Sequence, residues 1–160
     1  SAMPGAFPII QKAFETIGFA KVATSAKEAQ AIGYLQKDDS IVVNRDYIIS
    51  EAKAEVLSMS EDYVKPDIET FKLPGKSGRL VLDGTLKGFV KSGKISEHDA
   101  LIGRRLGYVL TGGDKGGPFT SVDEQYLLDI EREMFVSLAG EQKSIERIEY
   151  MLKRGKPLRN

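Results

Sequence analysis

Residues 96–113 read Ser-Glu-His-Asp-Ala-Leu-Ile-Gly-Arg-Arg-Leu-Gly-Tyr-Val-Leu-Thr-Gly-Gly and contain every signal of a complete helix. Ser96 and Asp99 are three residues apart, the spacing at which two side chains satisfy the free amides of a helix start. Gly112 and Gly113 follow the last apolar residues, as is typical beyond a helix end. This stretch predicts a helix over 96–111.

The same start and stop signals recur along the chain. They predict further helices at 7–19, from Ser25 to Gly33, from about Asp46 onward, and at 77–92, 121–138 and 141–154. Ser25 with Glu28, and Ser121 with Glu124, have the spacing of capping boxes. Apolar residues at helical offsets form two further stripes, one of Phe7, Ile10, Phe14 and Ile17 and one of Ile48, Ala52, Val56 and Met59.

Two short segments have the composition of strands. Tyr34-Leu35 and Ile41-Val42-Val43 flank a polar turn at 37–39. Pro66 and Pro74, with charged residues between them, interrupt the helical pattern. We therefore expect a mainly α fold with at most a minor two- or three-stranded piece, divided into residues 1–64 and a small helical bundle at 65–160.

Composition excludes several classes of protein. The 160 residues include 23 Lys plus Arg and 23 Asp plus Glu, so the chain lacks the positive field of a nucleic-acid binder. No apolar run approaches the roughly 20 residues of a membrane span. With one His and no Cys, we expect no metal site and no disulfide. We interpret Ser1 and Ala2 as a tag remnant, find no signal peptide, and expect a cytoplasmic protein.

Two glycine-rich segments raise the question of phosphate binding. Gly75-Lys76-Ser77 opens a predicted helix like the end of a P-loop, but Thr70 stands where the motif needs its first glycine. Pro74 also removes an amide donor. The second segment, 112–117, joins two predicted helices, and we interpret it as a flexible loop.

Few side chains suggest chemistry. His98, next to Glu97 and Asp99, could act as a base, but a surface histidine at a helix start is the simpler interpretation. Asp129 and Glu133 belong to the solvated face of an amphipathic helix. The basic residues at the end of the sequence complement a helix C-terminus and could also bind a CoA phosphate; they are Lys153, Arg154, Lys156 and Arg159. Spacing indicates no catalytic residues and no cofactor-binding residues.

Residues 19–35 resemble a segment of the enoyl-CoA hydratase (crotonase) family. Ala26, Glu28, Ala29 and Gly33 match its Ala-x-Glu-Ala helix and closing turn, whereas Tyr34-Leu35 departs from the usual Leu-Val. In that family the following helices run into a trimerisation region. The resemblance implies that residues 1–64 are the C-terminal part of a crotonase-like domain.

Residues 93–160 resemble the C-terminal end of bacterial multifunctional 3-hydroxyacyl-CoA dehydrogenases, on four stretches, 95–99, 110–114, 124–133 and 151–160. The resemblance implies fatty-acid β-oxidation, with an acyl-CoA substrate and NAD in the parent protein. No Gly-x-Gly-x-x-Gly follows a strand, so no dinucleotide site is expected here. The chain is therefore interpreted as an inactive C-terminal fragment that serves packing and oligomerisation.

The resemblance also leads us to expect a homo-oligomer, with the stripe on residues 7–19 in the interface, because a large exposed apolar patch favours self-association. A non-catalytic helical interaction module remains the alternative function.

Overall fold

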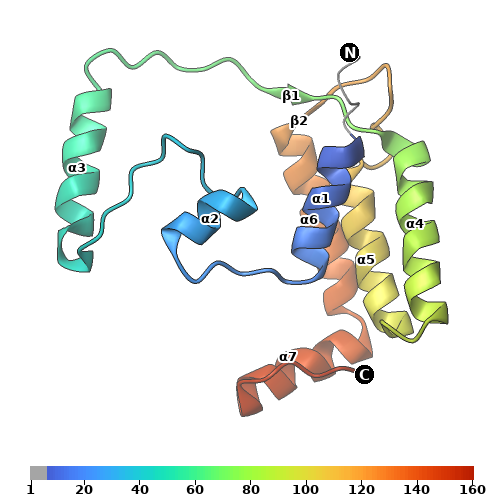
Figure 1. Ribbon diagram of the computed structural model, residues 1–160. Coiled ribbons are helices and arrows are strands. Elements are labelled where there is room, and N and C mark those ends of the chain that lie inside the picture. The colour runs from blue at the N-terminus through green and yellow to red at the C-terminus, as the bar shows by residue number, and fades with distance from the viewer. Residues whose placement is uncertain (1–6) are drawn as a thin grey trace. The chain divides into compact units, whose positions relative to one another are not determined.

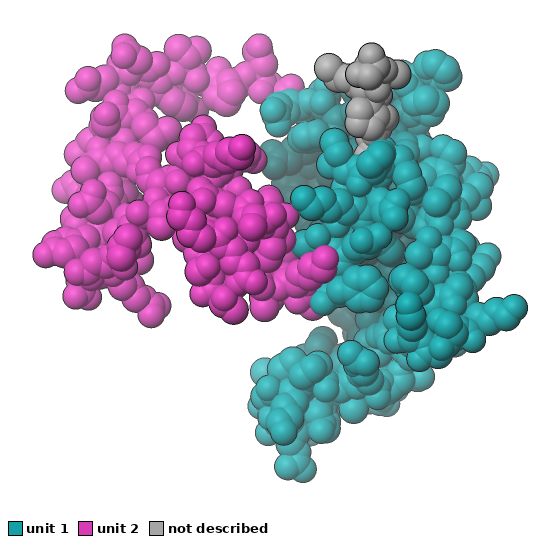
Figure 2. All heavy atoms as spheres, in the orientation of Figure 1, with its two compact units in different colours: residues 1–19, 69–160 teal, residues 20–68 magenta. Residues whose placement is uncertain are grey.

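The computed structural model describes residues 7–160, which are mainly helical, as expected (Figure 1). The chain forms two compact units (Figure 2). Residues 1–19, described from residue 7, join residues 69–160 in the bundle unit, and residues 20–68 form the insert unit. The structure thus groups the first helix with the C-terminal part of the chain, instead of dividing the sequence between residues 64 and 65.

The bundle unit is organised around one helix. It consists of α1 (Phe7–Gly18), α4 (Gly75–Lys91), α5 (Glu97–Leu110), α6 (Glu124–Ala139) and α7 (Gln142–Arg154). Helix α5 packs against α1, α4 and α6, and α7 follows α6 at the end of the bundle where α5 begins (Figure 1). None of the helices in the described part of the chain has the length and hydropathy that a membrane crossing requires.

The core lies where α1, α4 and α5 meet. Phe14, Leu82, Leu86 and Ala100 are buried together, and Phe7 and Ile10 pack against them. Ile17 remains half exposed. The predicted α1 stripe is therefore covered largely by its own chain, which removes the reason for placing it in an interface between subunits.

A small sheet closes the other end of the bundle. Strand β1 (Thr70–Phe71) pairs antiparallel with β2 (Val122–Asp123), so that Thr70 lies opposite Asp123. This pairing changes the start of α6, because Val122 and Asp123 are extended. The capping box predicted for Ser121 and Glu124 is wrong: the Asp123 carboxylate accepts from the amide of Tyr126 at 2.8 Å and caps the helix.

The insert unit contains α2 (Ala26–Ile32), a 3₁₀ turn (Arg45–Tyr47) and α3 (Ile48–Met59). Ser25 caps α2 as predicted, but the Glu28 carboxylate accepts from the amide of Thr24 at 2.7 Å rather than from that of Ser25. No residue of 20–68 is buried, so the predicted α3 stripe is exposed.

The strands predicted at 34–35 and 41–43 are wrong. Both segments are turns and irregular structure. The Tyr34 hydroxyl donates to the carbonyl of Lys21 at 2.6 Å, and the Gln36 amide donates to the Asp39 carboxylate at 2.7 Å. These local hydrogen bonds stabilise turns. Residues with high β-propensity do not form a strand where no neighbouring strand pairs with them.

Candidate functional site

A partly buried polar cluster joins the start of α5 to α7. The predicted capping box at Ser96 is confirmed, since the Ser96 hydroxyl and the Asp99 carboxylate each accept the other residue's amide. Arg147 on α7 donates to the same carboxylate at 2.7 Å. Nε2 of His98 lies 3.1 Å from the Ser144 hydroxyl. The interpretation of His98 as a surface residue is wrong, because α7 covers it.

Two pKa values in this cluster are lowered. Burial lowers the pKa of His98, and the positive charges of Arg147 and Lys143 add to this effect. Burial by itself would raise the pKa of Asp99, but hydrogen bonds from Ser96 and Arg147 outweigh it, and the net pKa is lowered. The cluster therefore favours neutral His98 and ionised Asp99. This indicates that its side chains hold α7 against the start of α5 and do not exchange protons.

We predict that the contribution of this cluster to the stability of the fold decreases in acid. A carboxyl or an imidazole whose pKa is lower in the folded state contributes stability above its unfolded pKa, and this contribution is lost as the pH falls through the folded pKa. The loss begins near the unfolded value of His, about 6.5, and continues through the range of Asp99. Arg147→Met should lower the free energy of unfolding by about 1–2 kcal/mol at neutral pH, since it removes the guanidinium that donates to Oδ1 of Asp99.

Denaturant unfolding measured from about pH 7 down to about pH 2 checks this prediction, because the variant and the original chain should converge only where Asp99, whose pKa is lowered in the folded state, is protonated. Lys153→Met is the control. The Lys153–Glu149 pair is exposed, so its loss should change stability by under about 0.5 kcal/mol. An Arg147→Met deficit that is constant across the pH range would contradict the role of Asp99.

The glycine-rich segments lie against each other. The Gly75 amide, at the start of α4, donates to the carbonyl of Thr111 at 2.9 Å. The Gly112 carbonyl accepts from the Gly116 amide at 2.7 Å, so residues 112–116 form a tight turn packed against α4 rather than a flexible loop. The amide that a P-loop would aim at a phosphate is therefore occupied by the protein itself.

The four basic residues proposed for CoA binding surround the end of α7. Lys153 and Arg154 occupy its last turn, and Lys156 and Arg159 follow Gly155, whose left-handed φ of 63° reverses the chain. All four side chains are exposed. Asn160 returns to α7 and accepts from Arg147 at 2.8 Å. Neither of the two hollows beside α5 that follow includes any of these four residues.

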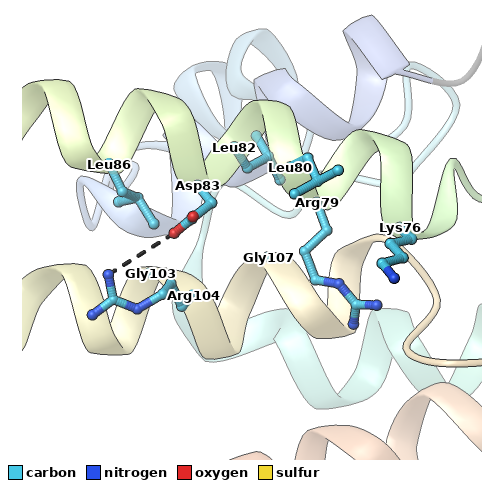
Figure 3. Close-up of a pocket in the computed structure, with 9 residues that line it drawn as sticks. All are labelled: Lys76, Arg79, Leu80, Leu82, Asp83, Leu86, Gly103, Arg104 and Gly107. Atoms are coloured by element: carbon cyan, nitrogen blue, oxygen red, sulfur yellow. Dashed lines mark ion pairs between the residues drawn. The ribbon is translucent and has the colours of Figure 1, made fainter.

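A hollow of about 280 Å³ opens between α4 and α5 (Figure 3). Two glycines of α5 allow the helices to approach closely: a Cβ on Gly103 would lie 2.7 Å from the Leu86 side chain, and one on Gly107 would lie 3.5 Å from that of Leu82. The Leu86 and Leu82 side chains pack directly on these two glycines, so this wall of the hollow is apolar.

Charged side chains surround this hollow. Lys76, Arg79 and Asp83 reach it from α4, and Arg104 reaches it from α5 (Figure 3). A guanidinium nitrogen of Arg104 is 3.9 Å from Asp83, whose carboxylate lies nearer to Lys87 at 2.9 Å. Oδ1 of Asp83 is buried without a hydrogen bond.

A second hollow of about 470 Å³ shares Arg79 and Arg104 and adds Arg105, Tyr108 and Met134. Nε of Arg105 is buried without a hydrogen-bond partner. Burial, followed by the neighbouring Asp114 carboxylate, raises the pKa of Tyr108, so its hydroxyl stays protonated and able to donate. The sequence contained a signal for this site in Gly103-Arg104-Arg105-Leu106-Gly107. Glycines inside a helical pattern indicate a position where another part of the chain packs closely against the helix.

Neither a metal nor a dinucleotide fits the residues described. Within 7–160, no three His, Asp or Glu side chains gather as metal ligands would. NAD would need a parallel sheet with a glycine-rich turn at a helix start. The sheet of the bundle is two-stranded and antiparallel, and α4 has its first amide bonded to Thr111. No step of dinucleotide chemistry is assigned to this chain.

Fold and site together define a mainly helical module with an arginine-lined groove between α4 and α5. The chain is similar to a protein of Bacillus subtilis (strain 168) described as a probable 3-hydroxyacyl-CoA dehydrogenase, with 46% identity over 151 residues. The match covers 93% of this chain and 19% of that protein, so the chain spans about a fifth of the relative's length. No family model matches the chain, and no solved structure matches it.

Proposed function

We propose that this chain is the C-terminal helical part of an NAD-dependent 3-hydroxyacyl-CoA dehydrogenase that also carries a crotonase-like enoyl-CoA hydratase region and acts in fatty-acid β-oxidation. The observation that carries the proposal is the 46% identity to the Bacillus subtilis protein, which extends across nearly the whole chain. The likeness of residues 19–35 to the crotonase family supports the hydratase region.

In this role the chain contributes packing and oligomerisation in a cytoplasmic enzyme, and the reacting groups and the NAD site belong to other parts of that enzyme. The exposed cations Lys153, Arg154, Lys156 and Arg159 contact a phosphate of the acyl-CoA substrate, because clustered ammonium and guanidinium groups attract a phosphate. Lysine and arginine at such a site act mainly through charge, so the contact should weaken with salt.

A replacement experiment tests the proposal. The matching segment of the Bacillus subtilis relative is exchanged for this chain, and NAD-linked oxidation of 3-hydroxybutyryl-CoA is measured. We expect the chimera to keep activity, and the 160-residue chain alone to show no turnover with this substrate or with crotonyl-CoA. A chimera carrying Phe14→Ala is the control for dependence on a folded bundle, because Phe14 lies in the core.

A folded chimera without activity would contradict the proposal, and turnover by the purified chain alone would contradict its non-catalytic role.

The exposed apolar side chains of the insert unit, among them Val43, Ile49 and Val56, favour a second candidate, a helical interaction module without substrate contact. Titration with CoA separates the two functions. If CoA changes neither the melting temperature nor the amide spectrum of the chain, the interaction module is favoured.

A further inference from the structure

The insert unit, residues 20–68, has a defined local structure but no core of its own (Figure 2). None of these residues, all of which the structure describes, is buried. Local hydrogen bonds hold the segment: Asn44 caps the 3₁₀ turn, and the Ser40 hydroxyl donates to the Glu55 carboxylate at 2.7 Å, which ties α3 to the preceding loop. Because apolar burial is the dominant favourable contribution to folding, this unit lacks the usual source of stability.

The apolar surface of the insert unit is large. Eleven of its large apolar side chains are at least half exposed, among them Val43, Ile49 and Ile68. Single exposed apolar residues are ordinary on a protein surface. Eleven of them within residues 20–68 are enough to supply the roughly 800 Å² that each partner contributes to a stable interface.

Helix α3 has apolar side chains on opposite sides. Leu57 and Met59 are two residues apart, which places them about 200° apart around the helix, and they are 58% and 66% exposed. Ile49 and Val56 are exposed on the arc between them. A helix that is apolar around most of its circumference is typical of a protein interior. Its partner must therefore enclose α3, because contact with one flat surface would leave one side exposed.

This geometry excludes a lipid surface and a second copy docked helix to helix. A helix that lies on a membrane has one apolar face and a basic polar face, whereas the insert unit contains nine Asp and Glu against six Lys and Arg. A second copy that met α3 through its own α3 would cover only one side of the helix.

The rest of a longer enzyme is a partner of sufficient size. The match to the Bacillus subtilis protein covers 93% of this chain, so it must include most of residues 20–68. The same match covers 19% of that protein, which leaves about four-fifths of its length outside the matched region. The relative thus combines a similar insert with a large amount of chain that could enclose it.

We propose that the insert unit docks against the remainder of the same enzyme, whose apolar side chains enclose α3 from both sides and bury Leu57 and Met59. This choice of partner rests on the function proposed above. The bundle unit is stabilised by its own core, and the insert unit is stabilised by the rest of the enzyme.

Cysteine labelling tests the proposal in the complete enzyme. The chain has no cysteine, so Leu57→Cys and Met59→Cys each introduce one thiol into it, on opposite sides of α3. The rate of reaction with a maleimide is measured in the 160-residue chain and in the chimera described above, and mass spectrometry identifies the labelled peptide. We expect both thiols to react at least about tenfold more slowly in the chimera, because they become accessible there only when the contact opens.

Arg132→Cys is the matched control. Its side chain is 73% exposed on α6 of the bundle unit, so its thiol should react at similar rates in the chain and in the chimera. Equal protection at this position would show that access is reduced everywhere, and would overturn the assignment to the insert unit. Leu57→Glu gives a second readout: it should lower the melting temperature of the chimera but not of the chain, because only in the chimera is a charge forced into an apolar contact.

The outcomes separate this surface from the proposed function. Rapid labelling at both α3 positions in a chimera that oxidises 3-hydroxybutyryl-CoA would overturn the docking and leave the proposed function standing. Slow labelling in a folded but inactive chimera would support the docking and contradict the proposed function. Protection in the 160-residue chain that increases with its concentration would make a second copy the partner, and protection at only one of the two positions would exclude enclosure; either result overturns the proposal.

Discussion

Phe14→Ala is expected to lower the free energy of unfolding by about 3–5 kcal/mol, the usual cost of deleting a buried aromatic ring. Phe14 is 6% exposed and is the residue through which α1 enters the core formed with Leu82, Leu86 and Ala100. Because α1 packs against α5, removal of the ring should detach the helix as well as leave a cavity. Urea unfolding followed by circular dichroism measures the change.

Ile9→Ala is the control on the same helix. Ile9 is 71% exposed, so its truncation should change stability by less than about 0.5 kcal/mol. Light scattering of the Phe14→Ala variant gives a second readout. A lower molecular mass at unchanged stability would place Phe14 in an interface between subunits, contrary to the packing described here.

Gly75→Ala should be almost as costly, with an expected loss of about 2–4 kcal/mol. Gly75 has a φ of 60°, which an L side chain adopts with strain, and a Cβ there would overlap the backbone carbonyl of Gly116. Backbone atoms cannot rotate away as a side chain can. The substitution should therefore separate the start of α4 from the 112–117 turn.

Gly88→Ala is a matched control in the same helix, because a Cβ at Gly88 meets nothing within 4 Å. It should stabilise the chain by about 0.5–1 kcal/mol through the lower entropy of the unfolded state. Thermal melts of the two variants should shift in opposite directions. Equal melting temperatures would show that the close contact at Gly75 is relaxed at no cost.

Local signals in the sequence predicted the helices well. The Ser96–Asp99 capping box and the glycine ends at Gly33 and Gly155 depend on residues within one turn of each other, and the structure contains them as expected. The true cap of α6 was missed because β2 draws Val122 and Asp123 into an extended pair with β1, about fifty residues earlier in the chain. Pairing between segments so far apart in the sequence cannot be predicted from the residues around the helix start.

The site was harder to predict for the same reason. His98 contacts Ser144 on α7, and Arg79 lines the same hollow as Arg104 and Arg105 only after α4 packs on α5. Helical periodicity predicts the buried face of each helix, but it does not predict which helix packs against that face. Glycine positions in α5 carried partial information, since two glycines one turn apart permit close packing, but they do not name the partner helix.

The insert unit has a consequence for how this chain folds and changes over evolution. Helix α1 belongs to the bundle core although residues 20–68 separate it from the rest of the bundle along the chain. The entropy lost in closing such a loop grows only with the logarithm of its length, so doubling the segment would cost roughly 0.6 kcal/mol. Burial of Phe14 alone outweighs that cost several times over. The bundle can therefore assemble before the insert is ordered, and insertions or deletions between residues 20 and 68 should be tolerated by the core far better than a single exchange within α1.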